Sequence, residues 1–179
     1  MDEKSNSIRS RFYFLAAVIL MIALIIGGVL LTRRAAFAAP QQPITFSHQL
    51  HDEKGVGCLF CHPSAMRADI AGIPSVEKCV GCHKTIATER DEVQAVLGYW
   101  ERGEAIPWQA VVRIGDYVFF SHQPHLSEGI ACETCHGNVN EMTVARPVLE
   151  MDMGWCLECH LDQPPEKVAK LTDCLTCHK

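Results

Sequence analysis

The stretch Cys132-Glu133-Thr134-Cys135-His136 decides how this chain folds. Two cysteines two residues apart, followed directly by a histidine, are typical of covalent haem c attachment. In that chemistry both thiols bond to the haem, and the histidine reaches the iron from one side. The pattern occurs five times in 179 residues, with the cysteine pairs Cys58/Cys61, Cys79/Cys82, Cys132/Cys135, Cys156/Cys159 and Cys174/Cys177 and the histidines His62, His83, His136, His160 and His178. We therefore predict five haem c groups, each with its motif histidine as the proximal iron ligand.

All ten cysteines lie in these five motifs, which leaves none for a structural disulfide. The alternative is zinc, because 17 residues separate the first two cysteine pairs and that gap suits a four-cysteine zinc site. Zinc would use such pairs two at a time, however, and it gives no reason for a histidine after every pair. The motifs therefore favour haem and indicate a protein that moves electrons.

An apolar run precedes the motifs. Residues 13–31 contain no charge, and a helix of that length, at about 1.5 Å per residue, spans roughly the hydrocarbon core of a bilayer. The alternative is a cleaved signal peptide, because Ala36-Phe37-Ala38 resembles a cleavage site. The run is longer than the apolar part of most signal peptides, and Arg33 and Arg34 stand before that site. We predict a cytoplasmic tail over 1–12 and a retained single-pass anchor over 13–31.

The part of the chain after the anchor is acidic. Five of the 16 basic residues and two of the 21 acidic residues lie within the first 34 positions, which leaves 11 basic and 19 acidic residues. Such a surface argues against a nucleic acid partner and suits a basic redox partner. Because haem c is attached on the outer side of the bacterial inner membrane, we expect this part on the periplasmic side.

An internal repeat follows the anchor. Phe46-Ser47-His48-Gln49-Leu50-His51 precedes Cys58 by six intervening residues, and Phe120-Ser121-His122-Gln123-Pro124-His125 precedes Cys132 by the same six. Self-similarity of this kind predicts duplicated structural units. We predict a linker over 32–43, a dihaem unit over 44–84, a connector over 85–118 and a trihaem unit over 119–179.

The predicted fold is mainly α-helical and irregular, with little secondary structure and a core filled by haems. A small domain with little apolar bulk needs such covalent supports. In the connector, apolar residues at helical spacing predict a helix over 85–102 that Gly103 ends. The β-branched and aromatic residues over 111–120, with a turn at Gly115-Asp116, predict a short hairpin.

Five low-spin haems need ten axial ligands. The five motif histidines supply one each, and the remaining four, His48, His51, His122 and His125, form two His-x-x-His pairs just before haem motifs. Ordinary surface or core histidines are the alternative, but two identically spaced pairs favour distal ligation. Histidines three apart in a helix lie about 5–6 Å apart at Cβ, so each pair should serve two different haems.

One ligand is missing from the histidine count. We expect a methionine, as in cytochromes with His/Met ligation. The candidates outside the anchor are Met66, Met142, Met151 and Met153. We favour Met153, three residues before Cys156, with Met142 as the alternative. A core methionine and an open iron position are the other interpretations.

The order of the motifs resembles that of class III multihaem cytochromes. More closely, residues 12–179 resemble the membrane-anchored pentahaem cytochrome subunit of alternative complex III. The resemblance rests on the duplicated Phe-Ser-His-x-x-His pair, on Ile106-Pro107-Trp108 and on Met153-Gly154-Trp155 before the fourth motif. It implies distal ligands at His48, His51, His122 and His125, and a methionine ligand.

The resemblance also implies a role in a quinol-oxidising membrane complex, without catalytic residues in this chain. Electrons would pass from quinol through an iron–sulfur protein and this chain to a periplasmic carrier or a terminal oxidase, with polytopic membrane subunits as further partners. One alternative is a self-sufficient membrane-anchored quinol dehydrogenase. Another is a multihaem reductase with one open axial position. Such reductases often carry a lysine in place of a motif histidine, and all five motifs here end in histidine.

Overall fold

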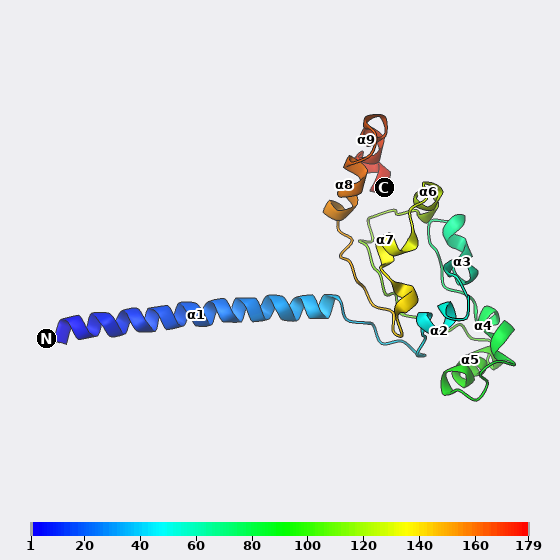
Figure 1. Cartoon of the computed structure of the whole chain (residues 1–179), viewed down its shortest axis with the longest axis horizontal. Helices are drawn as coiled ribbons and strands as arrows, with labels where there is room; N and C mark the ends of the chain where they lie inside the picture. Colours follow the sequence, from blue (N-terminus) through cyan, green and yellow to red (C-terminus); the bar gives the residue numbers. More distant parts are fainter. Residues whose placement is uncertain (1, 179) are drawn as a thin grey trace. The chain divides into compact units, whose positions relative to one another are not determined.

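The computed structural model describes residues 2–178 and, in the first helix, the side chains of Arg9 and of residues from Arg11 onward. The chain forms two compact units that are divided between Ala38 and Ala39 (Figure 1). The described residues form helices, turns and irregular segments without a β-strand, so the predicted mainly helical and irregular fold is confirmed. The helices are α1 (Asp2–Ala36), α2 (His48–Asp52), α3 (Cys58–Cys61), α4 (Val76–His83), α5 (Asp91–Glu101), α6 (His122–Ser127), α7 (Cys132–His136), α8 (Met153–Leu161), α9 (Pro165–Leu171) and α10 (Cys174–Cys177), with the 3-10 helices η1 (Pro63–Met66) and η2 (Val139–Glu141).

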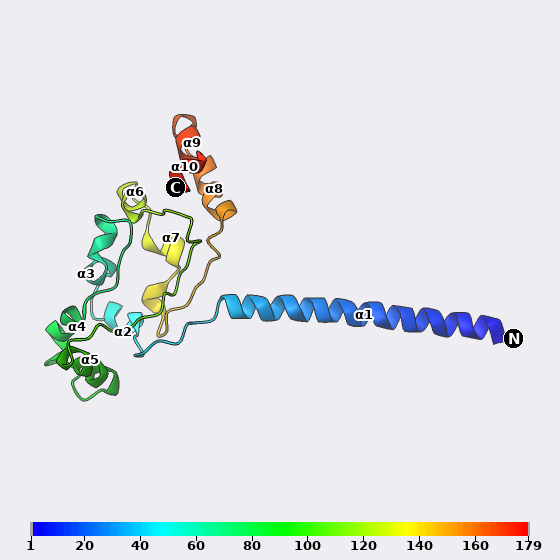
Figure 2. The ribbon, with the colours of Figure 1, turned by 180° about the vertical axis from the view of Figure 1, so that it is seen from behind.

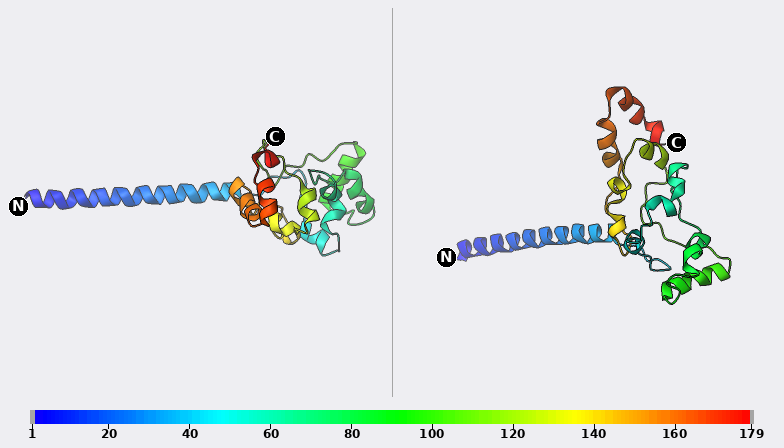
Figure 3. Two further views of the ribbon diagram at one scale, coloured as in Figure 1. Left: turned by 90° about the horizontal axis from the view of Figure 1, so that it is seen from above. Right: turned by 45° about the vertical axis from the view of Figure 1, so that its right-hand side comes forward.

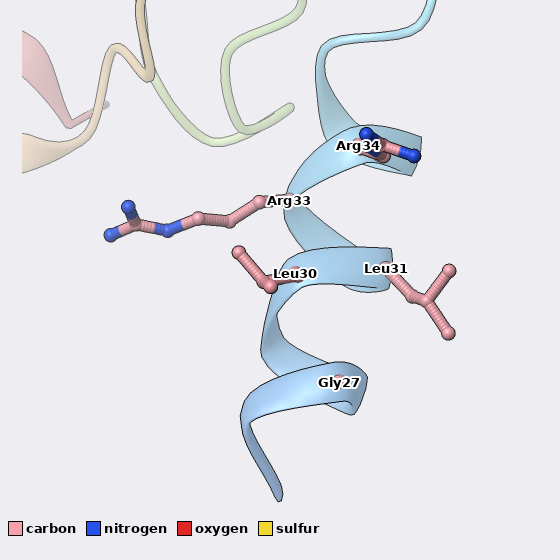
Figure 4. Close-up of a pocket in the computed structure, with 5 residues that line it drawn as sticks. All are labelled: Gly27, Leu30, Leu31, Arg33 and Arg34. Atoms are coloured by element: carbon pink, nitrogen blue, oxygen red, sulfur yellow. The ribbon is translucent and has the colours of Figure 1, made fainter. Parts of the chain in front are cut away.

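The first unit is essentially the single helix α1. Its segment Arg11–Ala36 is long and apolar enough to cross a membrane, and none of it is buried. Helix α1 continues through Ala36, so residues 32–36 belong to the helix and not to the linker that we predicted from 32. Figure 4 shows Leu30, Leu31, Arg33 and Arg34 projecting outward from its last turns. The predicted apolar helix is confirmed, and its length and composition suit a membrane anchor or a signal sequence.

The second unit is held together by few apolar side chains. Ile44, Val80, Val96 and Ile106 form its core cluster, where α4 packs against α5. Among the described residues no side chain is completely buried, and many large apolar side chains stay exposed. Because burial of apolar surface is the main force for folding, the polypeptide alone lacks the packing of a stable domain of this size.

The helix in the connector begins later than predicted. Helix α5 starts at Asp91, not at residue 85, because Ala87 adopts a left-handed φ of 55° and interrupts the chain after α4. The turn before it places the Ile86 carbonyl 3.1 Å from Nδ1 of His83. The predicted end is confirmed, since Gly103 has a φ of 65° and its N–H donates to the Trp100 carbonyl.

The predicted hairpin over 111–120 is wrong. The turn at Gly115-Asp116 forms, with the Val118 N–H donating to the Gly115 carbonyl, but neither flank is a strand. The Phe119 N–H instead donates to the Cys177 carbonyl at 2.8 Å. An isolated hairpin is at best marginally stable, and here the backbone finds its partner in the last haem motif.

The two copies of the repeat pack against each other within the second unit. Helix α2 of the first copy packs on η2 of the second, and α6 of the second copy packs on η1 of the first. The Gln49 N–H donates to the Met142 carbonyl at 3.1 Å, and Nδ1 of His122 lies 2.8 Å from the Asp69 carbonyl. Each copy therefore completes the surroundings of the other copy's histidine helix.

Helices α4 and α5 lie at one end of this unit, and α8, α9 and α10 lie at the opposite end (Figures 1 and 2). Figure 3 shows the same separation from two further directions. Helices α3 and α7 lie between these two ends in Figures 1 and 2, with α2 at the level of α4 and α6 at the level of α8.

Candidate haem-binding sites

Every Cys-x-x-Cys-His motif lies on a short helix. In α3, α7 and α10 the first cysteine is also the first helical residue, and in α4 and α8 the motif lies in the C-terminal part of a longer helix. Residues three apart on a helix are neighbours on one face, so the two thiols of each motif point the same way. Asp152 and Asp173 cap α8 and α10 by accepting from the Trp155 and Leu175 N–H groups.

Most of the histidines are held through Nδ1 by a backbone carbonyl. The acceptors are the carbonyls of Ser47 for His51, Gly72 for His62, Ile86 for His83, Asp69 for His122, Ser121 for His125, Leu171 for His160 and Tyr117 for His178, at 2.7 to 3.3 Å. An Nδ1–H donor leaves Nε2 with its lone pair free for a metal, and metal-binding histidines in proteins are usually held in this way. Sequence reasoning missed these carbonyls, because any residue type can supply one.

Three pairs of imidazole rings lie at nearly the same separation, with planes 5° and 22° apart in two pairs and 74° apart in the His51–His83 pair. The ring centres of His51 and His83 are 6.0 Å apart, those of His122 and His136 are 6.3 Å apart, and those of His125 and His160 are 6.1 Å apart. Metal–nitrogen bonds of about 2 Å, with about 1 Å more from each nitrogen to its ring centre, put two rings on one metal about 6 Å apart. These pairs therefore fit one iron between each two rings.

The repeated phenylalanines hold the distal histidine candidates in the same way in both copies. Phe46 lies edge-on to His48 at 4.8 Å and stacks on His51 at 4.5 Å. Phe120 lies edge-on to His122 at 4.9 Å and packs on His125 at 4.7 Å. The repeated sequence contained this signal, but its role as a support for both histidines was not inferred from it.

His48 is the candidate whose surroundings differ from those of its counterpart, His122. Its Nδ1 is buried and has no hydrogen-bond partner among the described residues. Burial lowers the pKa of His48, and the nearby His62 and His51 lower it further. A neutral imidazole is the form that binds a metal, so His48 beside His62 suits a fourth pair of iron ligands.

The fifth motif has a different neighbour. His178 stacks on the ring of Tyr117, with the ring centres 5.7 Å apart and the planes 25° apart. Nδ1 of His178 also lies 3.3 Å from the Tyr117 carbonyl, so Tyr117 orients this histidine. Met153 is the first residue of α8 and is 67% exposed. Met142 lies at the end of η2 beside α2.

The cysteines form neither disulfides nor a zinc-like cluster. All ten have free thiols, and within residues 2–178 no three His, Cys, Asp or Glu side chains converge on one point. Zinc needs four such ligands around it. The motifs are instead spread along the second unit, each with its own cysteine pair and histidine.

The chain is a multihaem cytochrome c, with an N-terminal apolar helix and motifs that fit covalent haem c. Residues 118–179 match the family described as cytochrome c7 and related cytochrome c. That segment contains the third, fourth and fifth motifs and forms a cytochrome c7-related domain. A search among curated proteins found no significant match. The class implies electron transfer, and because c-type cytochromes are extracytoplasmic, the haem-binding part lies outside the cytoplasm.

Proposed function

We propose that the chain is the pentahaem electron-transfer subunit of a membrane quinol-oxidising complex. It would receive electrons from an iron–sulfur partner, which quinol reduces, and pass them to a periplasmic carrier or a terminal oxidase. Polytopic quinol-oxidising subunits would be its neighbours in the membrane. The chain itself would carry no substrate site, as in the alternative complex III subunit that its motif order resembles.

The observation that carries this proposal is the set of facing histidine rings, 6.0 to 6.3 Å apart. Two imidazoles on each of these three irons would leave no open position there for a substrate, which favours electron transfer over catalysis. We assign His48, His51, His122 and His125 as distal ligands to the haems of the first, second, third and fourth motifs. Their proximal ligands would be His62, His83, His136 and His160, and the fifth haem would have His178.

Met153 is our proposed distal ligand to the fifth haem. It stands one helical turn before Cys156, so the two residues share one face of α8. Burial raises the pKa of the Cys156 thiol, and the nearby Cys177 of the fifth motif raises it further. The two cysteines therefore lie close together. We therefore assign the exposed thioether of Met153, one turn from Cys156, to the iron of the fifth motif. Met142 remains the alternative, although it lies beside α2, away from α10.

We propose that α1 is a retained anchor, so that the haem-binding part stays at the periplasmic face of the inner membrane. The length and composition of the span Arg11–Ala36 suit a helix in lipid, and the basic residues Arg33 and Arg34 lie in its last turn. Tethering keeps a subunit of this kind beside membrane-embedded partners and does not require tight binding to them.

Co-purification tests the complex. Detergent-solubilised membranes that contain the tagged full-length protein should yield iron–sulfur and polytopic subunits in fixed proportion, and the assembly should oxidise quinol. A lone haem protein that oxidises quinol by itself would support the alternative of a self-sufficient quinol dehydrogenase. A lone haem protein without that activity would contradict both.

A further inference from the structure

The second motif lies next to the first. His48 and His51 share the short helix α2, and His51 faces His83 of the second motif. The cysteines of the two motifs are also close together: burial raises the pKa of Cys79, and the nearby Cys61 raises it further. The first two haem sites are therefore neighbours through α2.

The third and fourth motifs repeat this relation. His122 and His125 share α6 and face His136 and His160 respectively. Burial raises the pKa of Cys135, and the nearby Cys159 and Cys156 raise it further. The second pair of neighbouring sites is thus built like the first.

The two pairs meet through their first members. After burial, the nearby Cys58 is the next cause that raises the pKa of Cys132, so the opening cysteines of the first and third motifs lie close together. These cysteines are equivalent positions of the repeat, since each opens the motif after its own His-x-x-His pair. The packing of α6 on η1, which follows the first motif, and of α2 on η2, which follows the third motif, brings the same two motifs together. The first motif therefore adjoins the third. The two copies of the repeat meet at the haem motif that follows the His-x-x-His pair in each copy.

The fifth motif adjoins the fourth at the far end of the unit. Helix α8, which carries the fourth motif, packs on α9, and two residues after α9 the chain enters α10 with the fifth motif. The second motif lies at the other end, on α4, where α5 packs against it. Figures 1 and 2 show these two ends on opposite sides of helices α3 and α7.

We propose that the five haem sites form one line that does not follow the chain, in the order second, first, third, fourth, fifth motif. This order rests on the proposed electron-transfer function and its ligand assignment. The sites at 79–83 and 174–178 are then the two ends, where donor and acceptor dock. A single electron from the iron–sulfur donor would enter at one end and reduce a carrier by one electron at the other. Between the two repeats, the electron would pass from the haem of the first motif to the haem of the third motif, or in the reverse direction.

Redox titration of three full-length variants tests the order. A thioether ligand raises a haem's potential, so His48→Met, His51→Met and His122→Met should each move one haem to earlier reduction. The added electron then lowers the potentials of adjacent haems most, because Coulomb energy falls with distance. We expect His51→Met to displace one further wave and His48→Met to displace two. His122→Met is the control, because its haem has two neighbours both in this order and in the order of the chain.

The order of the chain predicts the reverse, with two further waves displaced in His51→Met and one in His48→Met, and that result would overturn the proposal. A variant in which no wave moves shows that the substituted residue is not a ligand, which removes the premise. The unaltered protein gives a second measurement that does not depend on variants. Anomalous scattering from crystals of the full chain should place the first motif's iron between those of the second and third motifs. A second-motif iron between the first and third would equally overturn the order.

Discussion

The imidazole rings of His122 and His136 lie 6.3 Å apart and 5° from parallel, although they belong to different helices, α6 and α7. Nδ1 of the same His122 lies 2.8 Å from the carbonyl of Asp69, in the other copy of the repeat. The ring of His122 therefore lies beside His136 of its own copy's haem motif, while its Nδ1 is held by a carbonyl of the other copy. The geometry of this candidate haem site depends on the docking of the two copies.

Covalent attachment should be complete at all five motifs. The intact mass of the purified protein after acid-acetone extraction, which removes haem that is not covalently bound, should exceed the mass of the polypeptide by five haems. The reason is that all ten cysteines are free and paired two by two on helical faces. Fewer than five additions, or zinc in the metal analysis, would contradict the assignment of the motifs.

Loss of His51 or His125 should leave one iron without its distal ligand. We expect His51→Ala to convert the haem of the second motif from low to high spin, and His125→Ala to do so for the fourth, because these rings face His83 and His160. Electron paramagnetic resonance measures the spin states. Gln123→Ala is the matched control, since Gln123 lies in the same helix as His125 and should leave all spin states unchanged. Unchanged low-spin spectra in both histidine variants would show that neither residue is a ligand.

The sequence predicted those features that depend on covalent chemistry and on short-range pattern. The haem motifs, the apolar helix and the end of α5 at Gly103 could be read because each needs particular residue types at set spacings. The repeat was readable too, and its two copies have nearly the same geometry around Phe46 and Phe120.

Features that depend on backbone groups from distant parts of the chain could not be predicted. Residues 111–120 have the composition of a hairpin, but the Phe119 N–H donates to Cys177, and tertiary contact overrides β-propensity. The late start of α5 depends on the left-handed Ala87, which propensity does not indicate. The proposed order of the sites in space rests on packing between distant segments, such as that of α2 on η2 and of α6 on η1.

The helix α1 should hold the protein in the membrane. Vesicles washed with alkaline carbonate should retain the full-length protein, because a helical span of 26 residues with an uncharged apolar stretch over 13–31 partitions stably into the bilayer. N-terminal sequencing should find residues that precede Tyr13. A mature protein that starts at Ala39 and leaves the membrane in carbonate would show that α1 is a signal sequence.

Gly137, which follows the third motif, should tolerate a side chain less well than Gly129, which precedes it. Gly137 has φ 65° and ψ −168°, and an added Cβ would lie 2.5 Å from Cγ2 of Val148. Gly129 has φ 78° but open space around it. We expect Gly137→Ala to lower the free energy of unfolding by about 3 kcal/mol, from backbone strain and overpacking. Gly129→Ala should cost about 1 kcal/mol, from the left-handed conformation alone.

Thermal unfolding followed by Soret circular dichroism compares these two variants with the unaltered protein. Gly137→Ala should unfold at the lowest temperature of the three. Equal midpoints for the two variants would mean that Val148 moves aside without cost. A lower midpoint for Gly129→Ala would contradict the packing around Gly137.

The tenth axial ligand should be Met153. The nine histidines leave one of ten positions to another residue, and Met153 lies one helical turn before Cys156, whose thiol is close to Cys177 of the fifth motif. A thioether ligand stabilises ferrous iron, so the fifth haem should have the highest potential of the five. It would draw electrons toward one end of the chain of haems, where an acceptor could receive them.

Met153→Leu keeps the size and apolar character of the side chain and removes only the sulfur. We expect it to abolish the weak sulfur–iron charge-transfer band in the near infrared, together with the highest-potential wave in a redox titration. Met142→Leu is the matched control and should retain both signals, because Met142 lies beside α2. Loss of the band in Met142→Leu would move the assignment to that residue. An unaltered protein with no such band and one high-spin haem would have an open iron position, and would favour a reductase over an electron-transfer subunit.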